Sequence, residues 1–79
     1  MINYVEFDDK CDTIYIYFND SPVDHTKKLD DMRYIDYASD GTLIGVELLC
    51  VSDGVITDDL PHRAEIEQEL EDRGIKVFA

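Results

Sequence analysis

Alternating apolar and polar residues in the first two thirds of the chain predict a β-sheet. In the segment 13–18, with the sequence TIYIYF, Ile14 and Ile16 fall on one face of an extended strand. Tyr15 and Tyr17 fall on the opposite face, and β-branched and aromatic residues of this kind favour strands. Comparable patterns predict strands over residues 2–7, 13–18, 25–29, 32–37 and 42–51, with a short final strand over 75–78.

Turn and cap residues separate these strands and mark one helix. Gly41 predicts a hairpin turn, because glycine accepts the positive φ that such turns require. The helix is expected over residues 61–73, where a proline suits the first turn and Gly74 suits the position after the last. Its apolar stripe is thin, with Ile66 and Leu70 at its centre. We therefore expect packing against the sheet, rather than local interactions, to hold this helix in place.

Together these elements form one α+β domain over residues 1–79. We expect an antiparallel β-meander of four to five strands, one C-terminal helix packed on the sheet and a short terminal strand. Residues 1–52 form the meander, and residues 53–79 form a helix–strand extension. A chain of 79 residues buries only about 60–65 % of its unfolded surface, so its stability margin is thin. The expected core consists of Ile14, Ile16, Phe18, Ile35, Ile44, Val46, Leu48, Ile66 and Leu70.

Acidity is the strongest feature of the composition. The chain has 19 Asp and Glu residues against seven Lys and Arg, which gives a net charge of −12. Such a surface repels the phosphates of nucleic acids and of anionic membranes, so we expect neither as a partner. A basic protein is the partner that electrostatics favours. The alternative is that the acidity only keeps a small protein soluble or suits a saline cytoplasm.

The location of the protein is expected to be cytoplasmic. The chain begins without the basic and apolar regions of a signal peptide, and no apolar run is long enough to span a membrane. In that reducing compartment Cys11 and Cys50 are expected to be free thiols. A disulfide between them would require the fold to bring two strand ends together.

No motif in the sequence predicts catalysis, a cofactor or a metal site. The acidic clusters lack the spacing of a calcium loop, the two histidines lack a metal partner at a suitable spacing, and the serines lack an adjacent base. One alternative from another class is a metal- or ligand-dependent enzyme that uses carboxylates from the turns. It requires two or more acids to converge in one pocket. The candidates are Asp8, Asp12, Asp30 and Asp36.

The candidate partner-binding face consists of Tyr15, Tyr17 and Glu47. The two tyrosines lie opposite the expected core face of their strand, and Glu47 lies on the long strand 42–51. Tyrosine is a favoured anchor at protein interfaces. The alternative is cross-strand packing of the tyrosines beneath the helix.

Two stretches of the chain carry a resemblance to a known family. Their order and spacing resemble those of domain of unknown function 2283 (DUF2283), a family of small prokaryotic proteins, over roughly residues 1–52. The resemblance implies a small β-meander with an added helix, and it supplies no activity and no site. Some relatives are encoded beside small toxin-like proteins, which makes an antitoxin-like role a conjecture by association. The matching pieces are Tyr4, Phe7-Asp8, Asp12–Ile16, Leu29-Asp30, Ile35–Tyr37, Asp40-Gly41 and Leu43–Leu49.

We interpret the chain as a non-catalytic interaction module for a basic protein, with an antitoxin-like role as its narrower form. A third class of function is a self-associating structural protein. Small size and a long strand that is apolar on both faces in its second half lead us to expect a homodimer.

Added salt is expected to stabilise the fold. Repulsion among the 19 acidic residues opposes compaction, and ions screen that repulsion. The melting temperature should therefore rise from low to high NaCl concentration. A flat dependence would mean that the acidic side chains are paired well enough to cancel their mutual repulsion.

Overall fold

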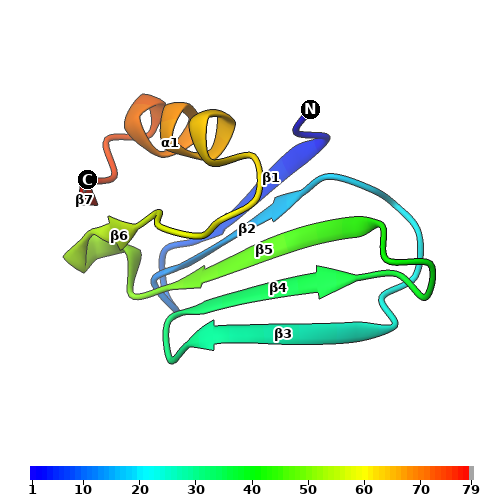
Figure 1. Ribbon diagram of the computed structural model, residues 1–79. Helices are drawn as coiled ribbons and strands as arrows, with labels where there is room; N and C mark the ends of the chain where they lie inside the picture. Colours follow the sequence, from blue (N-terminus) through cyan, green and yellow to red (C-terminus); the bar gives the residue numbers. More distant parts are fainter. Residues whose placement is uncertain (79) are drawn as a thin grey trace.

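The computed structural model describes residues 1–78 and has two layers, a β-sheet and a helix that lies over one of its faces (Figure 1). The fold is α+β, as predicted. Its elements are β1 (Tyr4–Asp8), β2 (Thr13–Tyr17), β3 (His25–Asp30), β4 (Arg33–Tyr37), β5 (Leu43–Leu49), the 3₁₀-helix η1 (Val51–Asp53), β6 (Val55–Ile56), α1 (Arg63–Asp72) and β7 (Val77–Phe78).

The order of the strands corrects the expectation of an uninterrupted meander. The main sheet has five antiparallel strands in the order β1-β2-β5-β4-β3, so β5 lies between β2 and β4. Strands β3, β4 and β5 form a meander, and the connection over residues 18–24 carries the chain from β2 to the far edge. This arrangement of β2 to β5 is a Greek key. The reason is that β5 is the most apolar strand and is buried best when it pairs on both sides.

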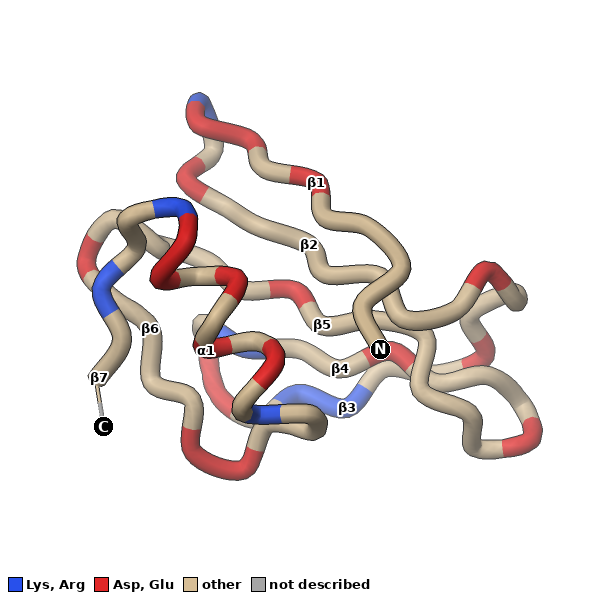
Figure 2. The backbone as a smooth tube through the Cα atoms, turned by 90° about the horizontal axis from the view of Figure 1, so that it is seen from above, with Lys and Arg blue, Asp and Glu red and all other residues tan. Residues whose placement is uncertain are grey.

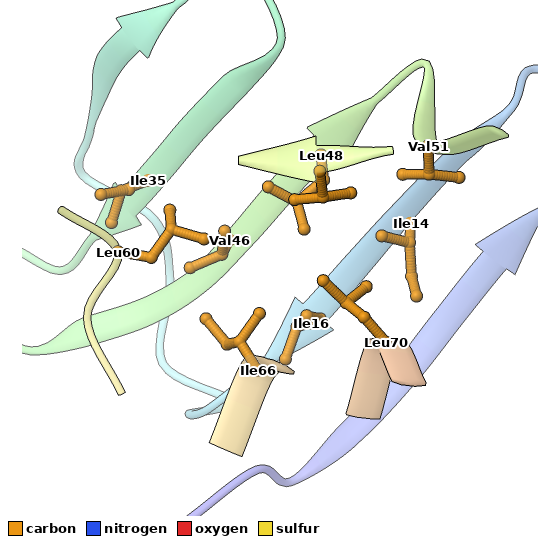
Figure 3. Close-up of a cluster of buried hydrophobic side chains, with 10 residues drawn as sticks. Ile14, Ile16, Ile35, Val46, Leu48, Val51, Leu60, Ile66 and Leu70 are labelled. Carbon is orange, nitrogen blue, oxygen red and sulfur yellow. The ribbon is translucent and has the colours of Figure 1, made fainter. Parts of the chain in front are cut away.

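The core lies between the sheet and α1. Side chains of Ile14, Ile16 and Val46 from the sheet are 0 % exposed, as are those of Ile66 and Leu70 from the helix. Figure 3 shows the two helix residues pointing towards the isoleucines of β2. Of the expected core, only Phe18 is half-buried. It packs against the cluster and stacks on His62, with the ring centres 4.9 Å apart.

Several element boundaries differ from the prediction because of local backbone geometry. Helix α1 begins at Arg63 rather than at residue 61, since His62 has a positive φ of 51° and cannot continue a helix backwards. Strand β5 ends at Leu49 rather than at residue 51, since Cys50 has a φ of 54° that turns the chain into η1. Strand β1 begins at Tyr4 rather than at residue 2.

Four buried apolar residues are absent from the expected core, three of them after the main sheet and one between β4 and β5. The expected final strand is shorter than predicted, and it pairs in parallel with β6, a strand that was not predicted. Both have only two residues, too few for an alternating pattern to show. The additional core residues are Ala38, Val51, Val55 and Leu60.

Polar side chains fix the C-terminal segment to the sheet. Thr57 is fully buried and donates its hydroxyl to Glu67 of α1, while Arg63 Nε lies 3.1 Å from the Thr57 hydroxyl and 3.2 Å from the Glu67 carboxylate. Arg33 of β4 donates from Nη1 to the backbone carbonyls of Ile56 and Asp58. These contacts join β4, the loop before α1 and α1 itself, so they fix the position of the helix on the sheet.

Candidate functional site

Helix α1 covers one face of the sheet, and no second layer formed by residues 1–78 covers the other face (Figure 1). The candidate residues Tyr15, Tyr17 and Glu47 all lie on this second face, which we call the open face. The register places ten side chains or backbone positions there in two rows across the strands. One row is Glu6, Tyr15, Glu47, Tyr34 and Lys28, and the other is Tyr4, Tyr17, Gly45, Asp36 and Thr26.

The ring of Tyr15 lies across the central strand. A Cβ atom built on Gly45 would lie 2.6 Å from the Tyr15 hydroxyl oxygen, so the ring occupies the space that any other residue would fill. The hydroxyl continues over β5 and donates to a carboxylate oxygen of Asp36 on β4. Burial, and then this hydrogen bond to a carboxylate, raise the pKa of Tyr15 well above its usual value. Tyr15 therefore links three adjacent strands on the open face.

Tyr17 belongs to a cluster of three rings at the β1 side of the face. It stacks on Tyr4 with the ring centres 4.2 Å apart, and it lies 4.3 Å from the ring of Tyr15 at an angle of 46°. Its hydroxyl donates to Glu6 at 3.3 Å. Burial, and then the neighbouring Tyr4 and Glu6, raise the pKa of Tyr17 to about 12. Tyr4, at the sheet edge, remains 49 % exposed, so the cluster presents aromatic surface to solvent.

Glu47 occupies the middle of the open face. It is half-buried between its cross-strand neighbours Tyr15 and Tyr34. Its carboxylate makes no hydrogen bond and no ion pair with any residue in the range 1–78. The negative charge of Glu47 is therefore available to a group that approaches the sheet from outside.

A pocket of about 380 Å³ lies where the tyrosine cluster meets the connection between β2 and β3. Tyr4, Tyr15 and Tyr17 form its aromatic side, and Asp20 and Asn19 lie on the side of the connection. The remaining lining residues are Ser21, Val23 and Ile44. We call this cavity the tyrosine pocket. None of its lining residues is basic, so no cation of the described chain neutralises it from within.

The turn carboxylates of the enzymatic alternative lie apart. Asp8 and Asp12 lie in or beside the turn at the β1 edge, and Asp30 ends β3 at the opposite edge. With strands spaced by about 4.8 Å, those edges are about 19 Å from each other. Asp36 lies within β4 and accepts hydrogen bonds from Tyr15 and Thr26. Among residues 1–78, no three His, Cys, Asp or Glu side chains are placed to hold a metal ion.

The two cysteines are free thiols in the structure. The fold does bring the strand ends beside them together, because Thr13 pairs with Leu49 and Asp12 accepts a hydrogen bond from Ser52 at 2.6 Å. No helix within residues 1–78 is long and apolar enough to cross a membrane. Acidic residues are spread over the turns, helix α1 and the strands of the sheet (Figure 2).

Two tyrosines of the open face, Tyr4 and Tyr34, belong to no candidate site in the sequence analysis, and Asp36 is a candidate there only for the enzymatic alternative. Their connection to Tyr15 and Glu47 depends on which strands pair, and on the register. One signal of this arrangement is present in the sequence. It is Gly45, the single glycine inside the predicted strand 42–51, since a glycine within a strand often marks the close approach of another group.

The comparison with known families decides the classification of the chain. The family described as protein of unknown function (DUF2283) matches residues 4–52, which is 49 of the 79 residues. The chain belongs to the DUF2283 family. It matched no curated protein and no solved structure. The DUF2283 segment contains all five strands of the main sheet and therefore every residue of the open face, whereas α1, β6 and β7 lie beyond it.

Replacing Gly45 with alanine is expected to destabilise the fold by about 1–3 kcal/mol, because the new methyl group must displace the Tyr15 ring. Urea unfolding of the wild type and of Gly45→Ala measures this loss. In a Tyr15→Ala background the same change should cost much less, since the clashing ring is gone. Equal costs in both backgrounds would contradict the packing of Tyr15 over the central strand.

High pH is expected to unfold the protein through the open-face tyrosines. The pKa of Tyr17 rises from the ordinary 10.0 to about 12 in the folded chain, so folding favours its neutral form. That stabilisation is complete below pH 10.0 and is lost as the pH rises through about 12. Melting temperatures should fall over this interval, and less steeply for Tyr17→Phe. An equal slope for both proteins would contradict a stabilising contribution from the raised pKa of Tyr17.

Proposed function

We propose that the protein is a non-catalytic interaction module that binds a basic protein through its open face. The observation that carries this proposal is the one-sided cover of the sheet. Helix α1 completes the core on one side, while the other side carries exposed tyrosine surface and the unpaired carboxylate of Glu47. Tyrosine is enriched among the residues that dominate binding energy at interfaces.

Electrostatics selects the charge of the partner. The open face has carboxylates at Glu6, Asp36 and Glu47, and Lys28 pairs with Asp31 at 3.1 Å rather than with any of these. The whole chain has a net charge of −12, so its field attracts a basic surface over a distance of about 10 Å at moderate salt. The charge accelerates the encounter, and the tyrosine rings supply the contacts that hold the complex.

A second copy of the chain is a less suitable occupant of this face. A symmetric dimer through this face would place the carboxylates of Glu6, Asp36 and Glu47 against the same acidic face of its partner, and like charges across an interface cost free energy. The homodimer expected from the sequence therefore remains a separate proposal. It requires contacts outside the open face, and sedimentation of the purified chain at tens of micromolar would measure it.

An antitoxin-like role is the narrower form of the proposal. An acidic module that covers the basic surface of a small toxic protein would neutralise it by occlusion, without chemistry. The support is the charge of the chain, and the role itself is a conjecture that the family resemblance suggests. Co-expression of the adjacent gene product with the wild type, and separately with an open-face variant, tests this form by the survival of the cells.

The general proposal is tested by two variants with the same change in charge. Glu47→Lys reverses a charge at the centre of the open face, and Glu71→Lys reverses one on the exposed surface of α1. Any protein captured by the wild type from native cytosol is purified, and its affinity for all three chains is measured by calorimetry at two salt concentrations. We expect a basic partner whose affinity falls at least about tenfold for Glu47→Lys and much less for Glu71→Lys.

Thermal melts of both variants establish that each is folded before binding is compared. The proposal fails if no stoichiometric partner is captured, if the partner is acidic, or if both variants bind as the wild type does. A partner that discriminates between the variants, and whose affinity weakens with added salt, supports it.

A further inference from the structure

The tyrosine pocket differs from the rest of the open face because it is concave and carries both aromatic rings and an acid. Tyr4, Tyr15 and Tyr17 contribute the rings, and Asp20 contributes the carboxylate, around a volume of about 380 Å³. The faces of tyrosine rings carry negative potential, which attracts a cation placed over them. A carboxylate beside the rings adds its own attraction. This combination suits a cationic group and repels an anionic one.

The pocket is held in shape by the protein's own hydrogen bonds. The hydroxyl of Tyr15 donates to Asp36, and that of Tyr17 donates to Glu6 at 3.3 Å. Asp20 accepts from the side-chain amide of Asn3 at 2.9 Å through Oδ1, and its Oδ2 makes no hydrogen bond with any residue in the described chain. The rings and the carboxylate are therefore positioned before a ligand arrives, which reduces the entropy lost on binding.

We propose that the tyrosine pocket binds the guanidinium group of an arginine side chain from the basic partner, an inference that rests on the proposed function. A planar guanidinium stacks on an aromatic ring and at the same time donates to a carboxylate, which a lysine ammonium does less well. The ring of Tyr4, stacked on Tyr17 and 49 % exposed, supplies the surface for stacking. The free oxygen of Asp20, which also lines the pocket, accepts from the guanidinium.

Two further carboxylates near the rings add to the attraction of the pocket for a cation. The acids that accept from Tyr15 and Tyr17 lie within hydrogen-bond distance of the ring hydroxyl groups, so a cation over the rings is attracted by Asp36 and Glu6 as well as by Asp20. Within residues 1–78, Lys28 is the basic residue of the two open-face rows, and it pairs with Asp31. No cation of the chain therefore competes for the pocket in the described structure.

The test titrates the ¹⁵N,¹³C-labelled protein with Nα-acetyl-arginine amide and follows the aromatic and amide NMR signals. The matched control ligand is the citrulline analogue, which has nearly the same shape without the charge. We expect saturable shifts confined to the tyrosine pocket, with a dissociation constant in the range of about 1–10 mM. The citrulline analogue should give no saturable shift at the same concentrations.

Two tyrosine variants separate the pocket from the general charge of the protein. Tyr4→Leu removes a ring of the pocket, and Tyr34→Leu removes an open-face ring that does not line it. Neither changes the net charge, and the amide spectra establish that both remain folded. Tyr4→Leu should weaken binding of the arginine probe about fivefold, and Asp20→Asn by a similar factor, while Tyr34→Leu leaves it unchanged.

Shifts spread over all acidic turns, equal binding of the citrulline analogue, or equal effects of the two tyrosine variants would each overturn the inference. The outcome of this test can be distinguished from the outcome of the test of the proposed function. If the probe binds in the pocket but no partner depends on Glu47, the cation site stands and the proposed function fails. If the partner depends on Glu47 but Tyr4→Leu does not alter its affinity, the proposed function stands and the arginine site fails.

Discussion

The double pairing of β5 is the constraint on which the rest of the structure depends. Because β5 pairs with β2 on one side and with β4 on the other, its pleat fixes which residues of three strands share a face. Val46 and Leu48 point to the helix side, while Gly45 and Glu47 point to the open side. A shift of one residue in the pairing with β4 would turn Asp36 towards the core, and a shift in the pairing with β2 would turn Tyr15 and Tyr17 towards it. The burial of this one strand therefore sets both the core and the candidate site.

The open face is stiffened by its own side chains rather than by a second layer. Tyr15 crosses the central strand above Gly45 and reaches Asp36, so one side chain connects β2, β5 and β4. Tyr17 and Tyr4 connect β2 to the edge strand β1 in the same way. An exposed face made of such contacts keeps its shape without a partner. That property suits a binding surface, because little ordering remains to be done when the partner arrives.

The segment beyond the DUF2283 match completes the core of the segment within it. Ile66 and Leu70 of α1 cover the isoleucines of β2, and without them that face of the sheet would be exposed to water. The polar contacts of Thr57, Glu67 and Arg33 determine where the helix sits. In this chain the C-terminal segment closes the core, and the DUF2283 segment supplies the open face.

The sequence by itself determined the type of each main element, most of the core and the face on which Tyr15, Tyr17 and Glu47 lie. Alternation within a strand depends only on the two-residue repeat of an extended chain, so it can be read locally. Strand order, the crossing of Gly45 by Tyr15 and the pocket beside Asp20 were decided only by the tertiary structure. These features join residues that are far apart along the chain, and the pairing that joins them is set by the burial of β5 as a whole. No single stretch of the sequence determines which strands pair.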